Sequence, residues 1–166
     1  MTAQTPRVGQ VQIKVDGATL PVAHMDLLID VVVEDDLDQP AMCVLRFQDQ
    51  EYTLLDGRTF ALGAALELRA ANPAGRFGPL FAGEVTALET EQEQSRTCFV
   101  VRAYDRSHRL HRGRKTRTFL QQSDAAIVAR IAREAGLSAD VESTPGVHEY
   151  VIQDNQTDFA FLRARA

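Results

Sequence analysis

The sequence has little of what stabilises small secreted proteins or anchors membrane proteins. Its 166 residues include only two cysteines, Cys43 and Cys98, each inside an apolar, strand-like stretch (AMCVLRF and TCFVV). Two distant cysteines do not form a disulfide framework, so we expect small buried thiols with no metal or catalytic role. No apolar run approaches the ~18 residues of a membrane span, and the start, MTAQTPRVGQ, lacks the regions of a signal peptide. We therefore expect synthesis and folding in the cytoplasm.

Motifs of catalysis and cofactor binding are also missing. The chain has no GxSxG, no GxGxxG and no P-loop pattern, and neither cysteine has a catalytic signature around it. His108 and His111 are three residues apart and could form a metal pair on a short helix, but the flanking arginines oppose a cation. Two exposed histidines in a basic loop are the simpler interpretation. Glu84, in FAGEV, is expected to face solvent or to pair with an arginine. The prediction is a protein without enzymatic activity, cofactor or metal.

The net charge of −5 conceals two stretches of opposite sign. Nine acidic residues and the single basic Arg46 lie between Asp26 and Asp56, whereas Arg106 to Arg117 contains six Lys or Arg, two His and no acid. The basic run suggests nucleic-acid binding, but the domain is acidic as a whole and no aromatic residues interleave the run. Contact with an acidic surface of another subunit is the favoured interpretation. The predicted subunit interface comprises Arg106, Arg109, Arg112, Arg114, Lys115 and Arg117 on the basic side, and Glu34, Asp35, Asp36 and Asp38 on the acidic side.

The first hundred residues alternate apolar and polar positions as β-strands do. Residues 8–15 lead into an Asp16-Gly17 hairpin turn, and further strands are predicted in LLIDVVVEDD, in AMCVLRFQD and around residues 65–70. The clearest hairpin joins PLFAGEVTALETE to RTCFVVRAYD. One face of its second strand is expected to carry Thr97, Phe99, Val101 and Ala103, with Phe81, Val85 and Ala87 opposite.

The pattern changes near Asp105. SDAAIVARIAREAGL predicts a helix with Ser123 as N-cap and Gly136 as its C-terminal stop. Two short strands, SADVES and HEYVIQ, should precede a last helix that begins at Thr157. No C-cap ends that helix, so we expect these residues to be the N-terminal part of a longer protein. The apolar faces are predicted at Ile127, Val128, Ile131 and Ala135 in the first helix, and at Phe159, Leu162 and Ala166 in the last.

The predicted fold class is mainly β (α+β). Residues 1–104 should form a tube-like antiparallel β-barrel domain, and residues 105–166 the beginning of an α+β region that is truncated.

Three segments in a fixed order resemble a known family. These are PLFAGEVTALETEQEQSRTCFVVRAYDRSHRLHRGRKTRTF, SDAAIVARIAREAGL and EYVIQDNQTDFAFLRARA, which together span residues 79–166. They are similar to the gp27-like baseplate hub family, which includes phage late control protein D, VgrG-like hub-spike proteins of type VI secretion and hubs of phage-tail-like injection particles. GEV, AYDRSHRL, RGRKTRTF and QDNQTDFAFL carry the match, and the last two are more similar to the protein D and extracellular-particle branch.

The resemblance implies a mechanical function. The chain would be a structural hub component of a contractile injection machine (phage tail, type VI secretion or extracellular injection particle), adapting a hexameric inner tube to a trimeric spike. Implied partners are the inner tube protein, a spike or spike-tip protein, other baseplate subunits and two further copies of the full-length chain, with no nucleic acid and no membrane span.

The same resemblance implies synthesis in the cytoplasm and assembly into the baseplate of a bacterial or phage particle, with release outside the cell left open. Two other functions stay open at this point: a cell-wall-targeting or hydrolytic module of such a machine, and a nucleic-acid-binding β-barrel.

Overall fold

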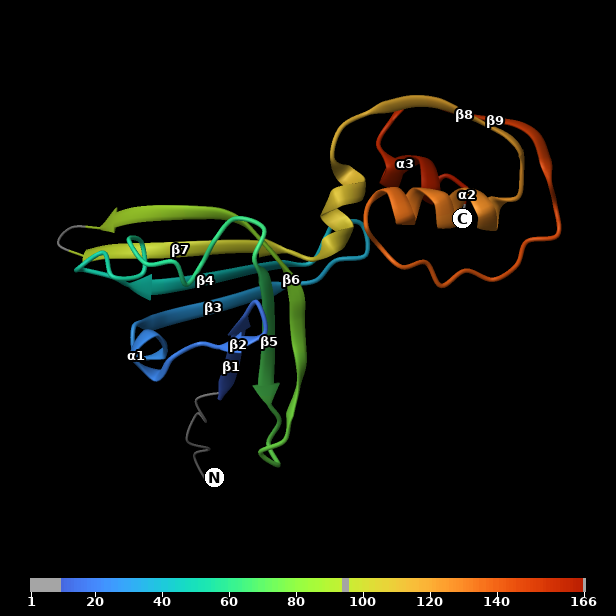
Figure 1. Ribbon diagram of the computed structural model, residues 1–166. Coiled ribbons are helices and arrows are strands. Elements are labelled where there is room, and N and C mark those ends of the chain that lie inside the picture. The colour runs from blue at the N-terminus through green and yellow to red at the C-terminus, as the bar shows by residue number, and fades with distance from the viewer. Residues whose placement is uncertain (1–9, 94–95, 166) are drawn as a thin grey trace, which may run out of the picture. The chain divides into compact units, whose positions relative to one another are not determined.

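The computed structural model describes residues 10–93 and 96–165, and the chain divides into two compact units, Met1–Asp105 and Arg106–Ala166. The first unit is an antiparallel sheet of seven strands in the order β2-β1-β5-β6-β7-β4-β3, which confirms the predicted mainly β fold (Figure 1). Its elements are β1 (Val11–Val15), β2 (Ala18–Thr19), α1 (Val22–Met25), β3 (Leu28–Glu34), β4 (Met42–Gln48), β5 (Ala65–Ala71), β6 (Phe77–Glu93) and β7 (Arg96–Tyr104).

The turn between β1 and β2 has the geometry that its sequence predicts. Val15 pairs with Ala18, so Asp16 and Gly17 alone form the connection. Both have positive φ, 48° and 79°, as a type I′ hairpin turn requires. The Asp16 carboxylate also accepts a hydrogen bond from the backbone N–H of Ala65 at 2.8 Å, which ties the turn to β5. The predicted hairpin is confirmed, while residues 8 and 9 of the predicted strand lie outside the described residues.

The long strand β6 joins the two halves of this sheet. Its first part pairs with β5 and its second with β7, and Figure 1 shows the strand changing direction between them. A β-bulge at Thr86 accompanies the bend, because Val85 pairs with Ala103 but Ala87 pairs with Arg102. The prediction that Ala87 shares a face with Val85 is therefore wrong. The extra residue reverses the alternation, and Leu88 takes the position that Ala87 was expected to hold.

Gly83, next to this bend, allows β6 and β7 to approach closely. A Cβ atom at Gly83 would lie 2.2 Å from the carbonyl oxygen of Tyr104 and 2.6 Å from the Phe81 ring, so no larger residue fits. The following residue, Glu84, is buried, with 7% of its surface exposed. The expectation that Glu84 faces solvent is therefore wrong, although its neighbours Phe81 and Val85 are the residues that enter the apolar core.

The curved sheet encloses an apolar core to which β1, β4, β5, β6 and β7 all contribute. Three aromatic rings meet in it: the ring centroid of Phe47 lies 5.5 Å from that of Phe60 and 6.5 Å from that of Phe99. Both cysteines are free thiols; Cys43 is fully buried as predicted, whereas Cys98 is only half-buried. Burial raises the pKa of the Cys43 thiol to about 12, so this side chain behaves as a small apolar residue.

The second unit combines a two-stranded antiparallel sheet with short helices. Its elements are η1, a 3₁₀ helix (Arg106–His111), β8 (Lys115–Gln122), α2 (Asp124–Glu134), β9 (His148–Gln156) and α3 (Asp158–Arg163). β8 pairs with β9, and the unit has its own small apolar core formed by Phe119, Ile127, Ile131, Val151 and Phe161. Among the described residues, no helix is long and apolar enough to cross a membrane.

Helix α2 begins and ends where the sequence predicts. The Ser123 hydroxyl accepts a hydrogen bond from the backbone N–H of Ala126 at 3.3 Å. At the other end, the N–H of Leu137 donates to the carbonyl of Ala132 at 2.8 Å, and Gly136 has a φ of 69°. This is a Schellman motif, which needs a residue that tolerates positive φ.

Several predictions in this unit are wrong. SADVES forms no strand, and only the following segment, β9, pairs with β8. In α3, Thr157 caps the helix as predicted, but Phe161 is the apolar residue that is buried, with Phe159 and Leu162 only partly so. The inner face of α3 starts with the buried carboxylate of Asp158, and Phe161 lies three residues further along the same face. The pattern of apolar residues alone could not reveal this face. Ala166 lies outside the described residues.

Candidate functional site

The predicted acidic residues lie together at the end of β3 and in the turn to β4. All four are exposed, and the carboxylate of Asp36 accepts a hydrogen bond from the backbone N–H of Asp38 at 2.9 Å. Glu34 and Asp36 line a cavity of about 260 Å³ whose other walls include Met42 and Tyr104. Since β3 is the last strand of the sheet, this acidic corner borders a sheet edge on which a further strand or subunit can pair.

The basic run divides into exposed and inward-facing side chains. Arg106, Arg112 and Arg114 are exposed, and Arg114 Nε donates to the carbonyl of Asn155 at 2.7 Å. Arg109 is half-buried, and its Nη1 donates at 3.0 Å to the carbonyl of Ala135, the C-cap of α2. A cation at this position is favourable because the helix C-terminus carries a partial negative charge.

Lys115 and Arg117 take part in a polar network around Asp158. Lys115 Nζ lies 2.5 Å from one carboxylate oxygen of Asp158, and Arg117 Nη2 lies 2.7 Å from the other. Gln153 donates to the same carboxylate at 2.9 Å and accepts from Arg117 Nε at 2.7 Å. Arg117 also pairs with Glu134 of α2. Asp158 is 3% exposed and Gln153 fully buried, so the centre of the network is screened little by water, whereas Lys115 and Glu134 at its ends are partly exposed.

The electrostatics of this network favour the ionised carboxylates. Burial alone would raise the pKa of Asp158, but the hydrogen bonds from Lys115 and Gln153 and the charges of Arg117 and Lys115 outweigh it and hold the pKa below its ordinary value. In Glu134 burial likewise acts against the hydrogen bonds from Arg117 and Arg130, and its pKa is also lowered. Lys115 and Arg117 therefore stabilise the second unit itself, and the exposed members of the run, Arg106, Arg112 and Arg114, are those best placed to meet a partner. The interface role of the run and of the acidic residues stays a prediction.

A second polar cluster was not predicted. Asp124, in the first turn of α2, lies 2.9 Å from His148 Nε2, and Arg165 Nε donates to its other oxygen at 2.8 Å. The hydrogen bonds from His148 and then from Arg165 lower the pKa of Asp124. The sequence marks Asp124 only as an acidic residue at a helix N-terminus. Its partners are 24 and 41 residues away along the chain, and only folding brings them together.

The two histidines of the basic run are not the exposed pair that the sequence suggested. His108 is 8% exposed, and the His111 ring stacks on Phe159 of α3 with ring centroids 4.1 Å apart. His108 is therefore buried, and His111 packs within the second unit. Across the part of the chain that the structure describes, no group of three or more His, Cys, Asp or Glu side chains is arranged to hold a metal ion.

The fold is shared with phage-tail and type VI secretion proteins. The 43 kDa tail protein of prophage MuSo2 from Shewanella oneidensis superposes with a TM-score of 0.69 at 13% identity, over 95% of this chain and 47% of that one. A type VI secretion component of Escherichia coli is described as structurally similar to the phage T4 tail proteins gp27 and gp5. It superposes with a TM-score of 0.57 at 18% identity, over 90% of this chain and 41% of that one. A tail protein of Neisseria meningitidis MC58 superposes with a TM-score of 0.57 at 12% identity, over 93% of this chain and 43% of that one. The chain thus spans just under half the length of each of these structures.

These likenesses establish a β-rich fold that the chain shares with the three proteins. Residues 5–166 match the Alg8 N-terminal domain family, and the chain belongs to that family. No curated protein matches the sequence.

Proposed function

We propose that this chain is part of a gp27-like baseplate hub, a structural and non-enzymatic component of a contractile injection machine that adapts a hexameric inner tube to a trimeric spike. The observation that carries the proposal is the fold, shared over 90–95% of the chain with two tail proteins and a type VI secretion component. The order of the GEV, AYDRSHRL and QDNQTDFAFL segments supports the same assignment. The partners would be the tube protein, a spike protein, other baseplate subunits and further copies of the full-length chain.

The charge distribution suits a protein that assembles head to tail. A heterologous ring contact joins two different surfaces, so complementary patches on one chain can pair between neighbours. The first unit presents the acidic corner around Glu34 and Asp36, and the second presents Arg106, Arg112 and Arg114. Because Lys115 and Arg117 are engaged inside their own unit, fewer cations remain for a nucleic-acid backbone, which favours a protein partner.

The proposal is tested by locating the protein in its native cells. The chromosomal gene is tagged, the product is purified gently, and the preparation is examined by negative-stain electron microscopy. We expect sheathed tubes with the tag at one end, where a baseplate lies. Small particles without tubes, obtained from cells that do assemble tubes, would contradict the hub function and leave only the shared fold.

The charge pairing is tested separately by reversing one exposed arginine. Arg112→Glu should weaken self-association of the full-length protein more at 50 mM salt than at 500 mM, because the Debye length falls from more than ~10 Å to well under ~8 Å. Mass photometry measures the oligomer fraction. Arg133→Glu, an exposed arginine of α2 outside the run, is the matched control. Equal effects of the two variants, or no salt dependence, would exclude the pairing.

A further inference from the structure

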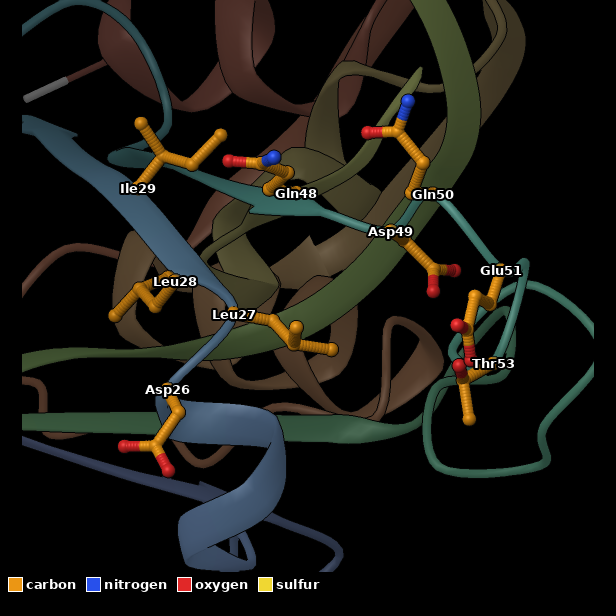
Figure 2. A pocket seen from close by; sticks show the side chains of 9 residues that line it. All are labelled: Asp26, Leu27, Leu28, Ile29, Gln48, Asp49, Gln50, Glu51 and Thr53. Carbon is orange, nitrogen blue, oxygen red and sulfur yellow. The ribbon is translucent and has the colours of Figure 1, made fainter. Parts of the chain in front are cut away.

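A cavity of about 460 Å³ lies in the first unit where the start of β3 meets the end of β4. Leu27, Leu28 and Ile29 form its apolar side, and Gln48 to Glu51 and Thr53 form the other side (Figure 2). Ile29 sits at a β-bulge, between Leu28, which pairs with Phe47, and Asp30, which pairs with Arg46. The bulge leaves Ile29 54% exposed beside the cavity, as bulges often redirect a side chain.

The buried carboxylate of Asp49 is the unusual feature of this cavity. Asp49 is 2% exposed, and one of its oxygens accepts hydrogen bonds from the backbone N–H groups of Leu54 and Leu55 at 2.9 and 3.1 Å. The other oxygen, Oδ1, is shielded from solvent and has no hydrogen-bond partner among the described residues. Figure 2 shows the carboxylate pointing away from the β4 ribbon, into the space between Leu27 and the segment that carries Glu51 and Thr53. A buried acceptor without a donor is costly, so a donor that reached Oδ1 would be bound favourably.

The surroundings of Asp49 favour a positively charged donor with an apolar stem. Asp26 and Glu51 are exposed on the walls of the same cavity, and with Asp49 they make its potential negative. A metal ion is disfavoured, because no group of three His, Cys, Asp or Glu in the described residues has suitable geometry. The leucines and Ile29 instead offer an apolar wall, along which the aliphatic part of a long basic side chain can pack while its head reaches a carboxylate.

We propose that this cavity binds an arginine or lysine side chain presented by a segment of a partner protein. On binding, the side chains that shield Asp49 Oδ1 move aside and the charged head donates to this oxygen. The aliphatic stem packs on Leu27 and Ile29, and the flanking peptide passes Asp26 and Glu51. Two observations carry the assignment: the buried carboxylate oxygen without a partner, and the acidic, apolar-walled cavity that Asp49 lines. The assignment does not depend on the proposed hub function.

The test is a titration of the ¹⁵N-labelled 166-residue chain followed by NMR. The probe is acetyl-Gly-Arg-Gly-amide, and the matched probe contains citrulline, which has nearly the same shape as arginine and no charge. We expect saturable shifts of the backbone amides of residues 26–29 and 48–53, with a dissociation constant of about 1 mM, and binding of the citrulline peptide at least tenfold weaker. Equal binding of both peptides, or shifts confined to other residues, would overturn the proposal.

Substitutions at single carboxylates test whether Asp49 binds the arginine peptide. Asp49→Asn should weaken binding of the arginine peptide at least tenfold, whereas Asp38→Asn, which removes an exposed charge outside the cavity, should change it less than twofold. If Asp49→Asn loses its native spectrum, the Asp26→Asn and Glu51→Gln pair tests the same cavity without disturbing the contacts of Asp49 with Leu54 and Leu55. Unchanged binding in that double variant or in folded Asp49→Asn would overturn the assignment. A last titration uses spermidine in place of the peptide. If spermidine binds tenfold more tightly than the arginine peptide, the cavity recognises small polyamines, and binding of a protein segment is excluded.

Discussion

The two units of this chain are stabilised in different ways. Sixteen buried apolar residues form one core in the first unit, whereas the corresponding cluster in the second unit has five among the residues described. The second unit is also much shorter, and a unit of about 60 residues buries a smaller share of its surface than a larger one. It adds a polar network around Asp158 and a second cluster around Asp124. The second unit thus supplements a smaller apolar core with hydrogen bonds and ion pairs, of which those at Asp158 are the most deeply buried.

The same contrast applies to charge. The first unit carries eight Lys or Arg against sixteen Asp or Glu, a net charge of −8, and the second carries ten against seven, a net charge of +3; together they give the −5 of the whole chain. The acidic residues of the first unit at β3 are exposed, whereas the second unit uses several of its cations internally. Charge counts along the sequence therefore overstate the basic surface that is open to a partner.

The largest effect is expected from removing an aromatic ring from the first core. Phe47→Ala should lower the free energy of unfolding of the first unit by about 4 kcal/mol, because the ring is fully buried against Phe60 and Phe99. Hydrogen exchange measured by mass spectrometry should show faster exchange in β4 and β7. Leu62→Ala, at a residue 68% exposed, is the control and should change stability by less than about 0.5 kcal/mol. A similar loss of stability in Phe47→Ala and Leu62→Ala would contradict the importance of the three packed aromatic rings.

A slightly smaller effect is expected at Asp158, and it should be confined to the second unit. Asp158→Asn removes the charge that Lys115 and Arg117 share and should cost about 3 kcal/mol, because both cations lose a charged hydrogen-bond partner at a buried position. Faster exchange is expected in β8, β9 and α3 with the first unit unchanged. Asp154→Asn, at an exposed position of β9, is the matched control. Equally faster hydrogen exchange in both units would contradict the view that the network around Asp158 stabilises the second unit alone.

The pH dependence of the stability that Asp158 contributes to the second unit provides a third test. The pKa of Asp158 is lowered from its ordinary value of 3.8, so its stabilisation is complete above that value and is lost as the pH falls through the lower value of the folded state. The stability difference between the wild type and Asp158→Asn should therefore shrink when the pH falls from about 5 to about 2. Urea unfolding followed by NMR at several pH values measures it. A difference that stays constant would mean that the charge of Asp158 is not the cause.

The smallest effect is expected at the N-cap of α2. Ser123→Ala should destabilise the second unit by about 1 kcal/mol, because the backbone N–H of Ala126 loses its acceptor. Faster exchange should appear first in the opening turn of α2. Ser123→Asp, which keeps an acceptor and suits the helix dipole, should preserve the stability. A loss in both variants would indicate that the hydroxyl has another role.

Local elements were predictable because their signals lie within a few residues. Asp16 and Gly17 satisfy the φ requirements of a tight hairpin turn, and Ser123 and Gly136 mark the two ends of α2. The errors have non-local causes. The bulge at Thr86 changes the face on which Ala87 lies, and the inner face of α3 includes a carboxylate that no apolar pattern reveals.

The candidate site was predictable only in part. Clustered charge along the chain predicts an interface at residues 34–38 and 106–117, but it does not indicate which of these side chains turn inward. Lys115 and Arg117 find Asp158 more than 40 residues away, and Asp49 was not singled out because an isolated Asp between polar neighbours has no distinctive pattern.

Strand alternation, turn chemistry, helix capping and net charge could thus be read from neighbouring residues, since each depends on backbone preferences or composition over a short stretch. Three features could not be read in this way: the burial of Glu84, Asp49 and Asp158, the bend of β6 near the bulge at Thr86, and the division of the basic run into internal and exposed residues. Each depends on which distant segments meet and on whether water is excluded there, and these conditions arise only when the chain has folded.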